Sequence, residues 1–264
     1  MHYLQAIIIA IVEGITEFLP ISSTAHMKFT NPIIGVPHSA FEEMYEVIIQ
    51  LAAILSVVVL YWRKFFDFKK INFYIKLIIA VIPALIIGVL FKKHIDTALS
   101  NLYFIAFVMI GGGVILLFVD KFFLSPSIYE EEKISNKQSF IIGCFQTLSI
   151  LLPGFSRSAA TIIGGMSQKL TRSLAAEFSF LLAVPTMFAA SVKTFYDVYK
   201  EHPEVINTAN MNILGIGSII SFVIALFAVK FFITYLQKHG FKVFGYYRIT
   251  IGLLILILLI LKVN

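Results

Sequence analysis

The stretch Glu13-Gly-Ile-Thr-Glu-Phe-Leu-Pro-Ile-Ser-Ser-Thr-Ala-His26 places ionisable and small polar side chains inside a long apolar segment. A second stretch, Gln146-Thr-Leu-Ser-Ile-Leu-Leu-Pro-Gly-Phe-Ser-Arg-Ser-Ala-Ala-Thr161, repeats part of this order, with Pro-x-x-Ser after an apolar run. Ionisable groups at bilayer depth are costly and usually have a function. The two stretches therefore predict two broken helices that together form one composite site.

The composition is that of an integral membrane protein. Of 264 residues, 59% are hydrophobic and only 14% are charged, whereas a soluble domain has about 25% charged residues. Although the net charge is +6, Lys and Arg flank apolar runs instead of forming a basic stripe, which argues against nucleic-acid binding. Apolar runs near 20 residues can cross a hydrocarbon core of about 30 Å. We predict six spans, at 44–62, 71–91, 102–119, 177–195, 211–232 and 243–261.

Two further apolar segments, 4–34 and 139–169, have a proline near the middle. We interpret each as a re-entrant hairpin, a backbone that survives in a bilayer only where protein buries it or a wet cavity lines it. Each half of the chain is then one hairpin plus three spans, and three is odd, so the halves form an inverted-topology repeat. The prediction is an all-α polytopic membrane protein with a single membrane domain, 1–264. It divides into a first repeat at 1–123, a solvated cytoplasmic linker at 124–138 and a second repeat at 139–264.

Most of the Lys and Arg residues fall on one side of this arrangement if the loop 63–73 is cytoplasmic. Cytoplasmic loops carry an excess of basic residues. The bias predicts that both termini and the first hairpin face the outside.

Glu13 and Glu17 lie one helical turn apart and share a face. Two close carboxylates repel as anions, so they favour a shared proton or a divalent cation. Because Mg²⁺ and Ca²⁺ take oxygen ligands, Glu13 and Glu17 are the candidate metal ligands.

Small polar residues follow Pro20 at the start of the returning helix: Ser22, Ser23 and Thr24. Ser23 and His26 are three residues apart on one face, and a hydroxyl beside an imidazole can be an activated nucleophile, with Glu17 able to orient the ring. A helix N-cap is the alternative role for Ser22 or Ser23. A satisfied buried histidine is the alternative for His26.

In the second stretch the Pro153-Gly154 pair ends one helix, and Ser156, Arg157 and Ser158 open the next. A helix N-terminus presents free N–H groups to an anion, and the Arg157 fork matches phosphate oxygens. Thr161 shares the face of Arg157. An ion pair with Glu17 is the alternative role for Arg157, and the two roles can coexist. The combined set predicts a phosphate site, and its position in a bilayer favours a lipid phosphate as substrate.

These residues resemble the undecaprenyl-diphosphatase family, also called the bacitracin-resistance family. The matching stretches are 13–26, Leu152-Pro-Gly-Phe-Ser-Arg-Ser-Ala-Ala-Thr-Ile162, Glu177-Phe-Ser-Phe-Leu-Leu-Ala-Val-Pro185 and Phe145-Gln146. Ala25 and Ala159 stand where we would expect Gly, with little effect unless the backbone there has positive φ.

The resemblance implies hydrolysis of undecaprenyl diphosphate to the monophosphate, recycling the lipid carrier of the bacterial cell wall. It also implies dependence on a divalent cation and a site at the outer face of the plasma (inner) membrane. By motif position, Glu17, Ser23, His26 and Arg157 would be catalytic. The residues around the diphosphate would be Glu13, Ser22, Thr24, Ser156, Ser158 and Thr161.

Several alternatives stay open on the sequence alone. The nucleophile could be Ser23, His26 or a metal-bound water. The inverted repeat with broken helices is also the architecture of many secondary transporters, so a polyprenyl-phosphate transporter or flippase is the competing function. A homodimer is compatible with the sequence.

Overall fold

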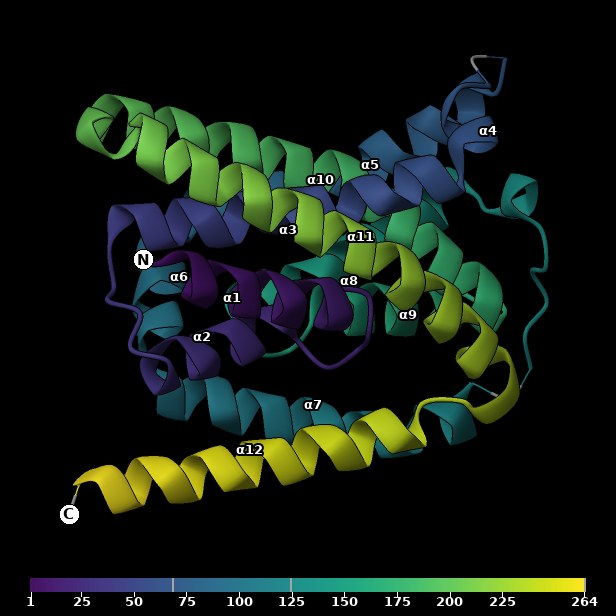
Figure 1. Ribbon diagram of the computed structural model, residues 1–264. Coiled ribbons are helices and arrows are strands. Elements are labelled where there is room, and N and C mark those ends of the chain that lie inside the picture. Colours follow the sequence, from purple (N-terminus) through teal and green to yellow (C-terminus); the bar gives the residue numbers. More distant parts are fainter. Residues whose placement is uncertain (68, 124, 264) are drawn as a thin grey trace.

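The computed structural model describes residues 1–67, 69–123 and 125–263, and within these ranges the chain is almost entirely helical (Figure 1). Phe68, in the loop predicted to be cytoplasmic, lies outside the described residues. So do Leu124, the first residue of the predicted linker, and Asn264, the last residue of the predicted second repeat.

Six described helices are long and apolar enough to cross a membrane, which confirms all six predicted spans. Two of them extend well beyond the predicted bounds, to 30 and 32 residues. Many large apolar side chains on them are exposed, including Ile78, Phe107 and Phe227, as expected for a protein with lipid as its solvent. The six are α3 (Ala40–Leu60), α5 (Ile71–Leu90), α7 (Leu102–Phe122), α10 (Arg172–Glu201), α11 (Thr208–His239) and α12 (Lys242–Val263).

The two proline-containing segments are both helix–loop–helix units, as predicted. The first consists of α1 (Tyr3–Thr16) and α2 (Ser23–Ile33), and the second of α8 (Asn136–Leu151) and α9 (Arg157–Ser167). Gly154 has a φ of +98° in the second loop, a conformation that glycine adopts without steric cost.

Both loops end at a serine with an unusual backbone. Ser22 has a φ of 71° and Ser156 a φ of 79°, and the hydroxyl of each accepts a hydrogen bond from the N–H three residues later. Non-glycine residues rarely adopt positive φ, and such strain concentrates at functional sites. The N-cap alternative thus applies to Ser22, and the caps pair Ser22 with Ser156, not Ser23 with Ser156 as the Pro-x-x-Ser pattern suggested. Neither Ala25 nor Ala159 has positive φ, so their difference from glycine brings no backbone strain.

The helices of the two halves interleave. Helix α1 packs against α11, α8 packs against α5, and α3 lies against both α10 and α11. Helix α12 runs beside α7 along one edge of the molecule (Figure 1). Short helices connect these elements: α4 (Trp62–Phe65), α6 (Lys92–Ser100), η1 (Glu131–Lys133) and η2 (Pro203–Val205).

The predicted linker is docked on the helices instead of solvated throughout. Glu131 is buried, and its Oε2 lies 2.9 Å from Nζ of Lys64. Lys76 donates to the carbonyl oxygens of Glu131 and Glu132, at 2.9 and 3.0 Å. Burial lowers the pKa of Lys64, but hydrogen bonds to Glu177 and Glu131 outweigh it and hold that pKa above its usual value. Glu131 is thus held in the protein by buried polar contacts, whereas Glu130 and Glu132 on either side of it are exposed.

Candidate active site

Glu17 joins the two broken-helix units through its two carboxylate oxygens. Arg157, the first residue of α9, donates from Nη2 to Glu17 Oε1 at 2.6 Å. Ser23, the first residue of α2, donates from Oγ to Glu17 Oε2 at 2.5 Å. All three side chains are buried or nearly so. One carboxylate therefore orients a hydroxyl and a guanidinium that come from opposite halves of the chain.

Arg157 keeps unused donor capacity. Its Nη1 donates to the carbonyl oxygen of Ser179 at 3.1 Å, whereas its buried Nε has no hydrogen-bond partner among the described residues. The alternative role for Arg157, an ion pair with Glu17, is confirmed. Because an N–H is left over, the pair is compatible with an additional anion on the same guanidinium.

Glu13 is fully buried, and neither of its carboxylate oxygens has a hydrogen-bond partner in the described part of the chain. The carboxyls of Glu17 and Glu46 lie close enough to interact with it electrostatically. A buried acid without a donor is costly, so the position favours a cation or a proton. No group of three or more His, Cys, Asp or Glu side chains in the described ranges could hold a metal. An ion here would thus take two carboxylates and complete its shell with other oxygens.

His26 has Ser22 and Tyr247 as its hydrogen-bond partners. Its Nδ1 donates to the carbonyl oxygen of Ser22 at 2.7 Å, and its Nε2 lies 2.9 Å from the hydroxyl of Tyr247 on α12. Since a carbonyl only accepts, Nδ1 carries the proton and Nε2 accepts from Tyr247. The rings also stack, with centroids 5.6 Å apart. The hydrogen bond expected between Ser23 and His26 is therefore not formed, because each side chain has another partner.

Ser158 and Thr161 lie behind the reactive groups. The Ser158 hydroxyl donates to the carbonyl oxygen of Leu19 at 3.0 Å and so joins the second loop to the first. The Thr161 hydroxyl donates to the carbonyl oxygen of Arg157 at 2.9 Å and lies 2.5 Å from the hydroxyl of Ser179. Neither lines the cavity described next. In the structure both hydroxyls support the backbone.

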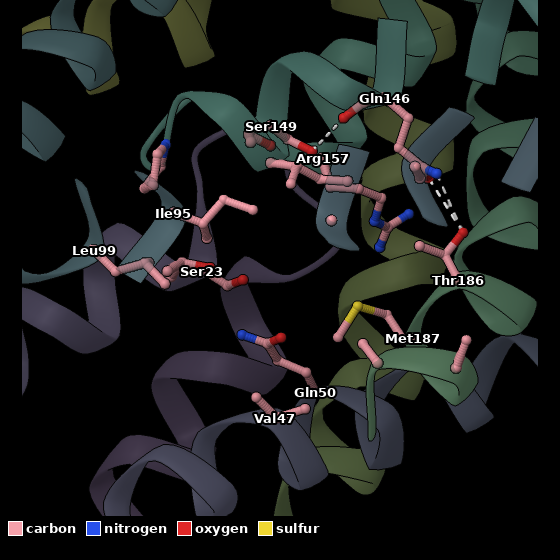
Figure 2. Close-up of a pocket in the computed structure, with 18 of the residues that line it drawn as sticks. Ser23, Val47, Gln50, Ile95, Leu99, Gln146, Ser149, Arg157, Thr186 and Met187 are labelled. Carbon is pink, nitrogen blue, oxygen red and sulfur yellow. Dashed lines mark hydrogen bonds between the residues drawn. The ribbon is translucent and has the colours of Figure 1, made fainter. Parts of the chain in front are cut away.

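A cavity of about 380 Å³ opens in front of Glu17. Its polar end is formed by six residues from the two units: Glu17, Ser22, Ser23, Thr24, Ser156 and Arg157. Its walls are mostly apolar and come from α3, α5, α6, α8 and α10. Figure 2 shows Ser23, Gln50 and Arg157 around this cavity. The cavity thus combines a small end that carries charged groups with walls that are mostly apolar.

Several polar residues at this cavity had no predicted role. Gln146 donates to the Thr186 hydroxyl at 3.3 Å across one wall, and Gln50 and Lys193 line the cavity from α3 and α10. Each is a polar residue inside a predicted span or broken segment. That is the signal that identified Glu13, so it could have found them too.

Comparison with known proteins gives one consistent family. The family model described as "Bacitracin resistance protein BacA" matches residues 6–254. A protein of Flavobacterium psychrophilum named undecaprenyl-diphosphatase is 50% identical over 258 residues, covering 98% of this chain and 96% of that protein. Proteins of the same name from Porphyromonas gingivalis and Aquifex aeolicus are each 46% identical, covering 100% and 94% of this chain and 99% and 95% of their own. On this full-length similarity, the chain belongs to the bacitracin resistance protein BacA family.

Proposed function

We propose that this protein is a membrane phosphatase that hydrolyses undecaprenyl diphosphate to undecaprenyl phosphate and inorganic phosphate. The observation that carries the proposal is the pair of contacts from Glu17 to Ser23 and Arg157 at the polar end of the cavity. A hydroxyl held by a carboxylate can act as a nucleophile, and a guanidinium beside it can stabilise the charge on a phosphoryl group. The names of the full-length relatives agree with this chemistry.

Ser23 is the nucleophile in this proposal, because its hydroxyl lines the cavity and already donates to Glu17. Its Oγ attacks the terminal phosphorus while Glu17 accepts the hydroxyl proton. The bond from that phosphorus to the bridging oxygen breaks, and undecaprenyl phosphate leaves with the proton from Glu17. Water then attacks the phosphoserine as Glu17 accepts its proton, phosphate is released, and Ser23 regains its proton. The catalytic role of His26 stays a prediction, because its contacts are with Ser22 and Tyr247 and do not include Ser23.

Charge neutralisation comes from two sources in the chain. Arg157 supplies a fixed positive charge with an unused N–H, and α2 and α9 both begin at the cavity, where their first N–H groups favour an anion. Glu13 and Glu17 would hold the divalent cation, Mg²⁺ or Ca²⁺. When bound, this ion would neutralise diphosphate charge.

The cavity walls fit a lipid substrate. Apolar residues from five helices line them, including Leu85, Val89, Ile95 and Leu99, so a polyprenyl chain can lie there while the diphosphate reaches Glu17. The protein thereby recycles the carrier lipid of the bacterial cell wall. Six helices that can span a membrane place the protein in the bilayer, where a lipid substrate also lies.

We propose further that the two broken units are re-entrant hairpins of an inverted repeat within one membrane domain. The pairing of helices supports this: exchanging the halves turns the α1–α11 contact into the α8–α5 contact, while α7–α12 maps onto itself. In Figure 1, α1 and α2 lie toward the end that carries both termini, and α9 lies toward the opposite end. The cavity is lined by α6 and the C-terminal half of α10, which the charge bias assigns to the outer face. A homodimer stays a prediction.

Phosphate release from undecaprenyl diphosphate by the purified protein in detergent tests the function. We expect release that depends on Mg²⁺ or Ca²⁺ and that falls by about 1,000-fold in Ser23→Ala, within the range for losing a nucleophile's contribution. Ser167→Ala is the matched control, because Ser167 is the last residue of α9 and its hydroxyl contacts only the Gly164 carbonyl oxygen and the Gln168 side chain in the described part of the chain.

Normal turnover in Ser23→Ala would exclude Ser23 as the nucleophile. A folded wild-type protein that releases no phosphate would exclude the phosphatase. If the same protein moved polyprenyl phosphate across liposome membranes, the competing transporter function would replace it.

A further inference from the structure

Arg248 is a charged residue in the middle of a membrane span that no step above uses. It lies on α12, and its side chain is fully buried. Its guanidinium has no carboxylate partner among the described residues and binds backbone carbonyl oxygens instead. Nε donates to Met109, Nη1 to Pro20 and Phe155, and Nη2 to Gly154, at 3.1, 3.0, 2.6 and 2.9 Å.

These carbonyls belong to three separate parts of the chain. Pro20 lies in the loop between α1 and α2, Gly154 and Phe155 lie in the loop between α8 and α9, and Met109 lies on α7. The Phe155 carbonyl directly precedes Ser156, and the Pro20 carbonyl comes two residues before Ser22, the two strained serines. A single planar fork thus fixes both loops where their backbone is under strain.

The geometry of α7 provides space for this side chain. A Cβ at Gly112 would lie 2.2 Å from Nη2 and 2.8 Å from Cζ of Arg248, so any larger residue would displace the guanidinium from its carbonyls. The neighbouring Gly111 has nothing within 4 Å of such a Cβ. A Cβ at Gly113 would meet the α12 backbone and Cβ of Arg248, so Gly112 is the position of these three where a Cβ would meet the guanidinium itself.

Burying an unpaired arginine is expensive, since even a hydrogen-bonded charge loses its hydration. Without it, the carbonyl oxygens that it binds would lose this donor, and three of these four carbonyls belong to the two loops of the site. A planar donor that reaches several carbonyls at fixed angles is what arginine offers over other side chains. The arrangement thus indicates that the role of Arg248 is to hold the two loops in fixed positions relative to each other.

We propose that Arg248, passing over Gly112, is a positioning residue for the hydrolysis. It holds the Glu17–Ser23 side of the site in register with Arg157 by binding both loops at once. The inference rests on the proposed function. It adds a third element, α12 with α7, to a site otherwise built from the two broken units.

The test compares Arg248→Lys and Gly112→Ala with the control Gly111→Ala, each purified in detergent and assayed well below its unfolding temperature. A lysine keeps the charge but cannot span both loops. We expect kcat to fall roughly 100-fold in the first two variants, the cost of misplacing reacting groups by about 1 Å, with KM changed less than about threefold. Gly111→Ala should match the wild type.

Hydrogen exchange of the loops at 17–22 and 152–156 gives a readout that does not need activity. We expect faster exchange in both loops in Arg248→Lys and Gly112→Ala, and unchanged exchange in Gly111→Ala. Wild-type kcat in Arg248→Lys or Gly112→Ala, or protected loops in both variants, would overturn the positioning role. If the wild type released no phosphate, the proposed function would fail. The exchange result would still show whether Arg248 and Gly112 hold the two loops in place.

Discussion

Glu17 uses each carboxylate oxygen for a different partner, so replacing one oxygen by an amide nitrogen disrupts one of the two contacts. In Glu17→Gln the amide N–H₂ faces a donor, either Arg157 or Ser23, and the remaining carbonyl cannot accept a proton. We expect kcat to fall by about 100- to 10,000-fold, the usual contribution of a general base. Phosphate release by purified protein measures it, with the exposed Glu43→Gln on α3 as control. Turnover within tenfold of the wild type would show that another group takes the Ser23 proton.

Glu13 differs from Glu17 because neither of its oxygens has a hydrogen-bond partner among the residues that the structure describes. Glu13→Gln removes a buried negative charge and one candidate ligand of the cation. We expect the Mg²⁺ concentration for half-maximal activity to rise at least about tenfold, as for loss of a ligand or its close support, while the unfolding temperature stays equal or rises. Activity titrated against Mg²⁺ measures the first and a melting curve the second. An unchanged Mg²⁺ requirement would remove Glu13 from the metal site.

At the scale of elements, the N-caps of α2 and α9 balance a favourable hydrogen bond against a strained backbone. Ser156→Ala loses the cap and keeps the strain, and should cost about 1 kcal/mol of stability. Ser156→Gly also loses the cap but relieves a φ of 79°, so it should be at least about 1 kcal/mol more stable than the alanine variant. Unfolding in detergent compares them.

The control for this pair is Ser173, in the first turn of α10. Its backbone is helical, so glycine there should be less stable than alanine by about 0.5–1 kcal/mol, the opposite order. The same order at both positions would mean that the positive φ of Ser156 stores no strain.

Helices α8 and α5 meet through a glycine. A Cβ at Gly143 would lie 2.2 Å from the carbonyl oxygen of Ala80, a backbone atom that can move only with α5. Gly143→Ala should therefore cost about 1–3 kcal/mol, as overpacking does. Gly215→Ala on α11, where a Cβ meets nothing within 4 Å, should gain about 0.5–1 kcal/mol from helix propensity. Melting temperatures in detergent check both, and a neutral Gly143→Ala would contradict this helix contact.

The elements were more predictable than the contacts between them. Apolar run length and proline position gave all six spans and both helix breaks, because these are local properties of the chain. Spacing also placed Ser23 and His26 on one face of α2. Spacing could not predict that the hydroxyl of Tyr247, 221 residues away, would form a hydrogen bond with Nε2 of His26. Arg248 stands out in its span by the rule that singled out Glu13, but its carbonyl partners depend on tertiary packing alone.

At the scale of the whole molecule, the site lies between the two halves of the chain, and helices of each half pack against helices of the other. Helix α1 of the first half packs on α11 of the second, α8 of the second packs on α5 of the first, and α3 and α10 lie together between them. The Glu17–Arg157 contact crosses the same boundary. The reactive groups are thus aligned by the fold as a whole, which agrees with one membrane domain in which neither half is active alone.

The orientation of this domain decides from which side the diphosphate is reached. The basic residues predict that η2 lies outside and η1 inside, and both carry exposed side chains, at Glu204 and Lys133. The single native cysteine, Cys144, is replaced by serine, and one new cysteine is introduced as Glu204→Cys or Lys133→Cys. A membrane-impermeant maleimide added to intact cells should label the Glu204→Cys protein and should label the Lys133→Cys protein only after permeabilisation. The reverse pattern would put the cavity on the cytoplasmic side, where it could not receive a diphosphate left at the outer face.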